Sequence, residues 1–302
     1  MKSELSVLIP CYNGKCWKLV ESLFALLEKE KSRVGLRYEV LVADDGSTDN
    51  DIIEHNKRID SLDNCQYIIR NKNVGRAAIR NFLAQQAQYE WLLFIDCDMV
   101  VRSDNYISQY IDNYETSVVY GGYSVGGDRG KLKANLRFVY EKKYEASHKH
   151  TERQKNPYRD FHTSNFLVKH DIMLRYPLDE RFRHYGYEDV LWGKTLKDNN
   201  IWIEHINNPL SFEKFESNTS FISKTEEGLM TLFHFRNELK GYSNIIKYTR
   251  KLHNLHLTYF MVSIHNFLSK YIKRNLQGNN PSLFLFYIYK VCFFCNLLNK
   301  NS

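Results

Sequence analysis

The sequence lacks most features of disordered, disulfide-bonded, secreted or membrane-spanning proteins. Its 302 residues include five prolines and no Ser/Gly or Pro/Gly tract, so no linker is evident. The six cysteines are scattered, which argues against a disulfide framework and favours free thiols in a reducing cytoplasm. No run reaches the roughly 20 apolar residues that cross a bilayer, and Leu5–Ile9 is too short for a signal peptide. We therefore expect a soluble, globular, cytoplasmic chain.

Acidic residues are missing from the C-terminal segment. Residues 239–302 contain no Asp or Glu but nine Lys or Arg, together with many aromatic residues. Residues 1–238 hold 33 Lys or Arg against 35 acids, so this body offers no evident nucleic-acid surface. The basic, aromatic tail fits two situations equally well: peripheral contact with an anionic membrane at its cytoplasmic face, or packing onto the body or a second subunit. The oligomeric state stays open.

The first hundred residues alternate between short apolar runs and helical patterns. Short apolar runs predict buried strands, and apolar residues three or four apart predict helices between them. The expected strands are Leu5–Ile9, Glu39–Ala43, Gln66–Ile69 and Trp91–Ile95, and the expected helices are Lys15–Glu30, Asp49–Asp60 (with Ser47 or Thr48 as N-cap) and Gly75–Gln88. Repeated strand–helix units with near-continuous apolar strands predict an α/β fold, a mainly parallel sheet flanked by helices.

Beyond Asp98 the pattern is less regular. Val118–Tyr120 is expected to be a strand and Leu132–His150 a helical stretch. A mixed block follows up to about Pro209, and the sequence beyond Phe221 is expected to be mainly helical.

Acidic residues follow two of the expected strands, where ligands bind in parallel α/β sheets. Asp96 and Asp98 close one strand, and carboxylates two residues apart on an extended chain project to the same side. Oxygen donors this close suit Mg²⁺ or Mn²⁺, although a solvated turn is the plain alternative. Asp44 and Asp45 follow another strand and exceed what capping of the next helix needs, so they are candidates for binding a ligand.

Two further segments carry candidate polar groups. Glu188 and Asp189 follow a glycine and a tyrosine, and burial there would raise a carboxylate's pKa towards that of a general base. Acids are also favoured at the start of any helix. Arg76 follows Gly75 at a helix start, where a guanidinium would suit a diphosphate. An ordinary surface arginine is the alternative.

Five segments together resemble the family-2 glycosyltransferases in order and spacing. They are SVLIPCYNG, EVLVADDGSTD, NVGRAAIRN, WLLFIDCDM and FRHYGYEDVLWGKTL, and they cover about residues 4–205. The resemblance implies the GT-A fold and an inverting, Mg²⁺- or Mn²⁺-assisted transfer of sugar from a nucleotide-sugar donor to a glycan or lipid-linked acceptor, as in polysaccharide biosynthesis. It implies a catalytic domain over residues 1–220, with a nucleotide-binding half (1–100) and an acceptor-binding half (101–220), and then a helical C-terminal extension (221–302).

The resemblance assigns nucleotide-binding positions. Pro10 and Tyr12 resemble the first nucleotide-contacting loop. Asp45 matches an acid that accepts a hydrogen bond from uracil, which favours UDP over GDP. Arg76 lies where a basic residue approaches the nucleotide.

The resemblance also assigns the acids. Asp96 and Asp98 match a pair that binds the sugar nucleotide and the metal, with Asp98 as the more direct ligand. Asp189 matches the catalytic base, and Glu188 matches its neighbour on the acceptor side. The stretch Phe161–Asn165 resembles a block that lines the donor-sugar pocket.

One position departs from the family pattern. Related enzymes often have a metal-binding histidine after an Asn-Pro-aliphatic step, but here that step ends at Phe212 without one, and His205 is the nearest upstream. Two alternatives remain. A sugar nucleotidyltransferase would favour a Gly-rich, basic first loop, unlike the one here, and a non-catalytic sugar-nucleotide or glycan-binding relative would fit the missing histidine.

Overall fold

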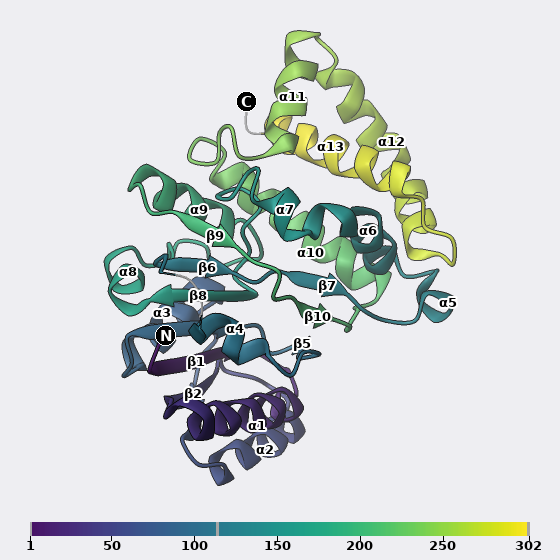
Figure 1. The fold of residues 1–302 in the computed structure, drawn as a ribbon. Coiled ribbons are helices and arrows are strands. Elements are labelled where there is room, and N and C mark those ends of the chain that lie inside the picture. Colours follow the sequence, from purple (N-terminus) through teal and green to yellow (C-terminus); the bar gives the residue numbers. More distant parts are fainter. Residues whose placement is uncertain (1, 113–114, 301–302) are drawn as a thin grey trace. The chain divides into compact units, whose positions relative to one another are not determined.

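The computed structural model describes residues 2–112 and 115–300 (Figure 1). They group into two compact units made of interleaved segments: unit 1 contains residues up to 126, 146–183 and 188–214, and unit 2 contains 127–145, 184–187 and the residues from 215 onward. The expected division after residue 220 stays a prediction. The two predicted domains begin at residue 1 and end at residue 302, and residue 1 and residues 301–302 lie outside the described residues.

Unit 1 is built on a seven-stranded sheet in the order β3-β2-β1-β4-β8-β6-β9 (Figure 1). Neighbouring strands run parallel except at β8, which pairs antiparallel with β4 and β6. The predicted mainly parallel sheet is therefore confirmed. The strands are β1 (Glu4–Cys11), β2 (Arg37–Asp44), β3 (Cys65–Ile69), β4 (Trp91–Ile95), β6 (Val118–Tyr120), β8 (Asn165–Lys169) and β9 (Ile203–His205).

The central strands are buried on both faces, which explains their near-continuous apolar sequence. Alternate side chains of a strand point to opposite faces, and in β1 both Val7 and Leu8 are fully buried. Leu8 belongs to the core that Ile79 and Leu83 of α3 (Arg76–Gln86) help to form. Helix α1 (Trp17–Val34) packs on β2 and on α4 (Tyr106–Asp112). The sheet is thereby flanked by helices, as predicted.

The helix expected over Asp49–Asp60 is two shorter elements, α2 (Asn50–Asn56) and a 3-10 helix, η1 (Lys57–Ser61). The N-cap is Asp49 rather than Ser47 or Thr48, because its carboxylate accepts two amide N–H groups of the first turn. The Ser47 hydroxyl instead bonds to the loop that follows β1, where it accepts the amide N–H of Asn13 at 2.7 Å.

The helical stretch expected over Leu132–His150 is also broken into short pieces. These are α5 (Arg129–Leu132), α6 (Leu136–Tyr144), the 3-10 helix η2 (Glu145–His148) and α7 (His150–Arg153). Asn135 ends the continuity, because its side chain caps α6 by accepting the amide N–H of Phe138 at 2.8 Å.

The mixed block of unit 1 adds a small sheet and two helices. The sheet has the order β5-β10-β7. Its strands are β5 (Met99–Val100), β7 (Tyr123–Val125) and β10 (Leu210–Phe212), and the helices are α8 (His170–Arg175) and α9 (Glu188–Asp198). Helix α9 begins with the two acids that the sequence singled out.

Unit 2 is helical, as predicted for the sequence beyond Phe221. Its long helices are α10 (Asn218–His234), α11 (Asn244–Asn254), α12 (Thr258–Gln277) and α13 (Leu283–Lys300). Helix α13 packs against both α12 and α10. The buried residues of this core include Phe221, Ile272, Leu276, Phe286 and Tyr289.

Helix α13 differs from the expectation that no segment could cross a membrane. In the part of the chain that the structure describes, it alone is long and apolar enough by length and composition, with a mean hydropathy of 1.3 over 18 residues. One third of the window (33%) is buried within the protein, and core helices of soluble proteins share this composition. The feature is therefore weak evidence for a span.

Candidate active site

Two loops meet where β1 and β2 end. The strands are in register with Cys11 opposite Asp44, and Asn13 adopts a positive φ of 48° just beyond β1. Its backbone N–H donates to Ser47 at 2.7 Å, and its side-chain oxygen accepts the amide N–H of Thr48 at 2.9 Å. The structure therefore brings together Pro10 near the end of β1, the following loop with Tyr12, and the loop that carries Asp45.

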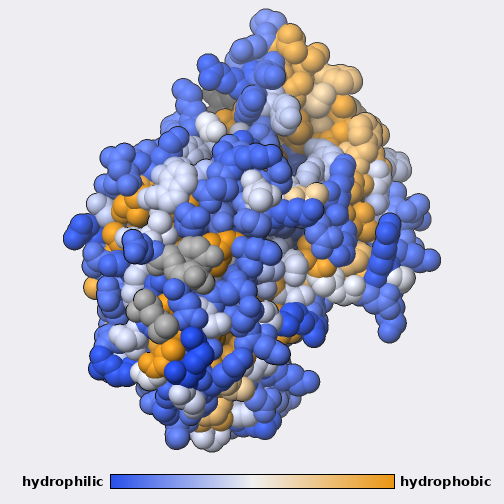
Figure 2. Space-filling model, in the orientation of Figure 1, coloured by the Kyte–Doolittle hydropathy of each residue, from blue (hydrophilic) through white to orange (hydrophobic). Residues whose placement is uncertain are grey.

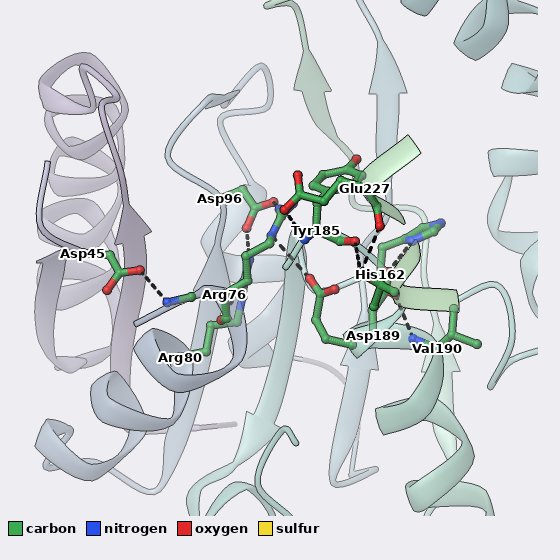
Figure 3. A network of polar contacts seen from close by, with 12 residues as sticks. Asp45, Arg76, Arg80, Asp96, His162, Tyr185, Asp189, Val190 and Glu227 are labelled. Carbon is green, nitrogen blue, oxygen red and sulfur yellow. Dashed lines mark hydrogen bonds and ion pairs between the residues drawn. The ribbon is translucent and has the colours of Figure 1, made fainter. Parts of the chain in front are cut away.

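Asp45 joins this edge to the start of α3. Its two carboxylate oxygens accept the amide N–H groups of Val74 at 2.9 Å and Gly75 at 3.0 Å (Figure 3). Burial raises the pKa of Asp45, although these two hydrogen bonds oppose the rise. Asp45 thus positions the turn directly before Arg76, while its predicted contact with uracil stays a prediction.

Asp96 lies at the centre of an ion-pair network (Figure 3). Arg80, only 2% exposed, donates to one Asp96 oxygen and to the backbone carbonyl of Arg76 at 2.9 Å. The Arg76 guanidinium lies 3.6 Å from the other Asp96 oxygen and 3.3 Å from Glu188 Oε1. Arg76 therefore connects the acid after β4 to the acid that begins α9.

Arg80 was missed by the sequence reasoning. It lies on the buried face of α3, among Ala77, Ile79, Leu83 and Ala84. A charged side chain on the buried face of a helix requires a buried partner. That pattern was the available signal, and the partner is Asp96.

Asp96 and Asp98 are not on an extended chain, so the predicted geometry of this pair was wrong. Strand β4 ends at Ile95, and the amide N–H of Met99 donates to the Asp96 carbonyl at 3.1 Å, closing a turn. Burial, and then the charge of Asp96, raise the pKa of Asp98, while Arg76 and Lys214 oppose the rise. Two neighbouring acids in this environment favour a bound cation.

The donor set fits a divalent cation in part. Asp96 and Asp98 supply hard carboxylate oxygens of the kind that Mg²⁺ and Mn²⁺ bind. Among residues 2–112 and 115–300, however, no group of three or more His, Cys, Asp or Glu side chains is placed to hold a metal. Two carboxylates with open positions fit an ion that takes its other ligands from substrate phosphates and water.

Asp189 is held by two hydrogen bonds at the start of α9. Its Oδ2 lies 2.8 Å from Nδ1 of His162, and its Oδ1 accepts the amide N–H of Val190 at 2.8 Å (Figure 3). Burial alone would raise the pKa of Asp189, but His162 and the Val190 amide outweigh it, so the pKa is lowered. The expectation that burial would raise this pKa was wrong because the pairing with His162 was not foreseen.

Glu188, the neighbouring acid, behaves in the opposite way. Burial raises its pKa even though the charge of Arg76 opposes the rise. Its Oε2 is buried and has no hydrogen-bond partner in the described chain. Adjacent acids whose pKa values move apart are typical of sites that need one ionised and one protonated carboxyl group.

His162 also lines a polar cavity of about 100 Å³. The other lining residues are Tyr120, Tyr123, Ser147, His148, Arg153 and Asp160. Arg153 is buried and donates to the carbonyls of Gly121 at 3.1 Å and Ile206 at 2.8 Å. The cavity adjoins the Asp189 pair and could hold a hydroxyl-rich group.

His205 cannot replace the missing metal-binding histidine. Its Nδ1 accepts a hydrogen bond from Arg153 Nε at 3.2 Å, and its Nε2 lies 2.9 Å from the carbonyl of Pro157. Burial lowers its pKa to about 4, so the ring stays neutral. Both ring nitrogens of His205 therefore have hydrogen-bond partners within the protein, and neither is free to bind a metal.

The stretch Phe161–Asn165 was expected to line the donor-sugar pocket. Within it, both polar atoms of the Asn165 side chain have hydrogen-bond partners inside the protein. Its side-chain oxygen accepts from the hydroxyls of Tyr106 at 2.6 Å and Tyr110 at 2.9 Å. Its amide nitrogen donates to the carbonyls of Gly122 and Asn208. Two residues of this stretch contact site acids: His162 pairs with Asp189, and the Ser164 carbonyl accepts the amide N–H of Asp96 at 3.1 Å.

Sequence comparison finds relatives among glycosyltransferases. The sequence profile named Glycosyl transferase family 2 matches residues 6–174. The chain is 39% identical to the chondroitin synthase of Escherichia coli over 97 residues, covering 32% of this chain and 13% of that protein. It is 25% identical to the chondroitin synthase of Pasteurella multocida over 228 residues, covering 64% and 23%, respectively. The chain therefore spans less than a quarter of either synthase.

Structure comparison finds the same architecture in S. aureus TarS. The crystal structure of TarS 1-349 in complex with UDP-GlcNAc has a TM-score of 0.51 at 15% identity, covering 99% of this chain and 92% of that chain. The complex with UDP has a TM-score of 0.50 at 17% identity, covering 99% and 91%. These likenesses confirm the predicted GT-A fold. The matched profile covers more than half of the sequence, and the chain belongs to glycosyltransferase family 2.

Proposed function

We propose that the protein transfers a sugar from a nucleotide-sugar donor to a hydroxyl group of a glycan or lipid-linked acceptor, with inversion at the sugar carbon. The observation that carries this proposal is the network in which Arg76 links Asp96 to Glu188, next to the oriented Asp189 carboxylate. Family membership supports glycosyl transfer. TarS was crystallised with UDP and with UDP-GlcNAc, so uridine donors are the first to test.

Donor binding requires positive charge near the diphosphate. Arg76 is partly exposed at the N-terminus of α3, where the helix dipole also favours an anion. Asp45 fixes the turn that precedes Arg76. We assign Pro10, Tyr12 and Asp45 to the nucleoside, and Arg76 to the phosphates.

Asp96 and Asp98 are the residues that would hold Mg²⁺ or Mn²⁺. Once bound, such an ion offsets negative charge on the departing diphosphate. Asp96 already has two arginine partners, whereas no salt bridge engages Asp98 among the described residues. Asp98 is therefore the acid whose charge most needs a cation.

Asp189 is proposed to be the general base. The acceptor oxygen forms a bond to the anomeric carbon as the bond from that carbon to the diphosphate oxygen breaks, and the acceptor proton passes to Asp189. The nucleoside diphosphate leaves with the electron pair of the broken bond. Attack from the side opposite the leaving group inverts the configuration. Glu188, with its raised pKa and its free buried oxygen, is proposed to hold an acceptor hydroxyl.

A donor panel tests the proposal. UDP-, GDP- and CMP-sugars are incubated with candidate acceptors and Mn²⁺, and nucleotide release and product anomer are measured, with and without chelator. We expect one nucleotide class to support release, and we expect chelator or Asp98→Asn to abolish it, while the exposed control Asp104→Asn has no effect. Pyrophosphate release would indicate a nucleotidyltransferase, and donor binding without turnover would indicate a non-catalytic binding protein.

A further inference from the structure

Helix α12 has apolar side chains on two opposite faces. One face carries Val262, Ile272 and Leu276, which are buried, and Ile272 and Leu276 belong to the core of unit 2. The other face carries Phe260, Phe267 and Tyr271, which are 59%, 78% and 72% exposed. Spacings of seven and four residues place these three rings on one side of the helix. A helix that is apolar on both sides is unusual at a surface facing only water.

The exposed face is part of a larger surface, which we call the aromatic patch. It is defined by α12 and the segments at its two ends, with Leu255, Leu257, Tyr259, Phe260, Phe267, Leu268, Tyr271 and Phe284 all exposed. Hydrophobic residues gather along α12, at the upper right of Figure 2. Contiguous apolar surface of this kind marks a contact site.

Positive charge lies directly beside the patch. Lys270 and Arg274 are exposed and lie three residues beyond Phe267 and Tyr271, respectively, so each is adjacent to an aromatic ring on the helix surface. Helix α11 exposes Lys247, Arg250 and Lys251. No acidic residue occurs between residue 239 and the end of the chain. The segment therefore combines exposed aromatic rings with cations and has no acid of its own.

The tail's aromatic residues divide into two groups, one buried and one exposed. Phe286, Tyr289 and Phe294 of α13 are buried within unit 2, as the packing alternative required. Phe267 and Tyr271 of α12 are not covered in this way. Helix α12 packs against α13 and keeps its other face exposed.

We propose that the aromatic patch docks on the surface of an anionic lipid bilayer. Aromatic side chains favour the headgroup region, and adjacent lysines and arginines bind lipid phosphates. The charge pattern argues against a second copy of the patch as the partner, because a two-fold contact would place Lys270 and Arg274 against their own copies without an acid to pair with. The assignment to the cytoplasmic face stays a prediction. Such docking would bring unit 1 to lipid-linked acceptors.

Vesicle co-sedimentation of the full chain tests this proposal. The probes are phosphatidylcholine vesicles with and without phosphatidylglycerol, at low and high salt. We expect the protein to pellet with the anionic vesicles and to be released by salt. The triple variant F260S/F267S/Y271S should bind at least tenfold more weakly, and K270Q/R274Q should lose the preference for anionic lipid. Since the triple variant could misfold, Phe267→Ser alone is tested as well, with circular dichroism as the folding check.

Matched controls separate the patch from general surface effects. I69S/L174S/W202S removes three exposed apolar side chains of unit 1, and K57Q/K155Q removes two exposed lysines there, so both should bind vesicles as the unchanged protein does. Equal recovery of all proteins in the supernatant would overturn the proposal. So would a concentration-dependent dimer, seen by gel filtration without lipid, that F267S abolishes. Nucleotide release with a soluble acceptor is measured separately, so a failure of lipid binding is distinguishable from a failure of the proposed transfer.

Discussion

His162 Nδ1 lies 2.8 Å from Oδ2 of Asp189, the proposed base. This contact is strong enough, with the Val190 amide, to keep the pKa of Asp189 low in a buried position. The adjacent Glu188 has a raised pKa, because burial outweighs the opposing charge of Arg76. Asp189 is therefore ionised at neutral pH and ready to accept a proton.

Replacing His162 should weaken transfer and change its pH dependence. In His162→Ala, burial acts on Asp189 with the Val190 amide and the charge of Arg76 in opposition, so we expect the pKa of Asp189 to rise. We expect the acid limb of kcat/KM against pH to move to higher pH, with a loss of about tenfold or more at neutral pH. His162→Asn, which can still donate a hydrogen bond, should recover part of the loss, and the exposed control His253→Ala should match the unchanged protein. If His162→Asn were as inactive as His162→Ala and no limb remained, His162 itself would be the base.

Stability should fall as pH decreases through the titration range of His205. Burial lowers the folded-state pKa of His205 to about 4, whereas an unfolded histidine titrates near 6.5. The unfolded state therefore binds more protons in this window, so stability is fully present above pH 6.5 and is lost towards pH 4. The loss amounts to about 3 kcal/mol. Urea unfolding at several pH values should show a flatter dependence for His205→Gln, and an unchanged slope would assign the effect to other groups.

Asp45 should contribute to stability as well as to donor binding. Asp45→Asn keeps one acceptor oxygen for the Val74 and Gly75 amides and places an NH₂ group against the other, so we expect a loss of about 1.5–3 kcal/mol in urea unfolding. Donor affinity should fall in parallel, because the turn before Arg76 loosens. The exposed acid Asp51 provides the control, as Asp51→Asn. Unchanged stability with lost affinity would make Asp45 a ligand-binding group alone.

Two glycines with similar backbone angles should respond differently to alanine. Gly35 has φ of +70° and no heavy atom within 4 Å of an added Cβ, so Gly35→Ala should cost only the left-handed strain of about 1–2 kcal/mol. Gly46 has φ of +72°, but its Cβ would lie 2.6 Å from the carbonyl carbon of Lys72 and 2.7 Å from the nitrogen of Asn73. Gly46→Ala should therefore lose more stability and also weaken donor binding. Equal unfolding free energies for the two variants would show that the Lys72 segment moves freely.

The strands of unit 1 were predictable because burial on both faces produces continuous apolar runs. The antiparallel strand β8 was not, because its pairing with β4 joins residues 70 to 78 positions apart and leaves no local signal. The turn at Asp96–Asp98 was missed for a related reason. A single backbone hydrogen bond to the Asp96 carbonyl decides it, and strand patterns carry no information about that bond.

The candidate site also has a part that was predictable from the sequence and a part that was not. The acids were predictable, since each follows a strand or begins a helix in a recognisable segment. Their partners were not: Arg80 reaches Asp96 across 16 residues, and His162 reaches Asp189 across 27. The contact with His162 reverses the expected direction of the pKa of Asp189. Sequence patterns thus locate the charged groups, but only the folded chain shows which groups neutralise each other.

The most direct test compares donor affinity with transfer rate in Asp189→Asn. The matched control is Asp198→Asn, which changes an exposed acid at the opposite end of the same helix, α9. Calorimetry gives the affinity for the donor identified by the panel, and single-turnover assays give the rate of transfer. The account predicts that Asp189→Asn binds donor as the unchanged protein does but transfers sugar about 10²-fold more slowly or worse, while Asp198→Asn is unaffected. Transfer by Asp189→Asn at nearly the native rate, with Glu188→Gln inactive, would contradict it.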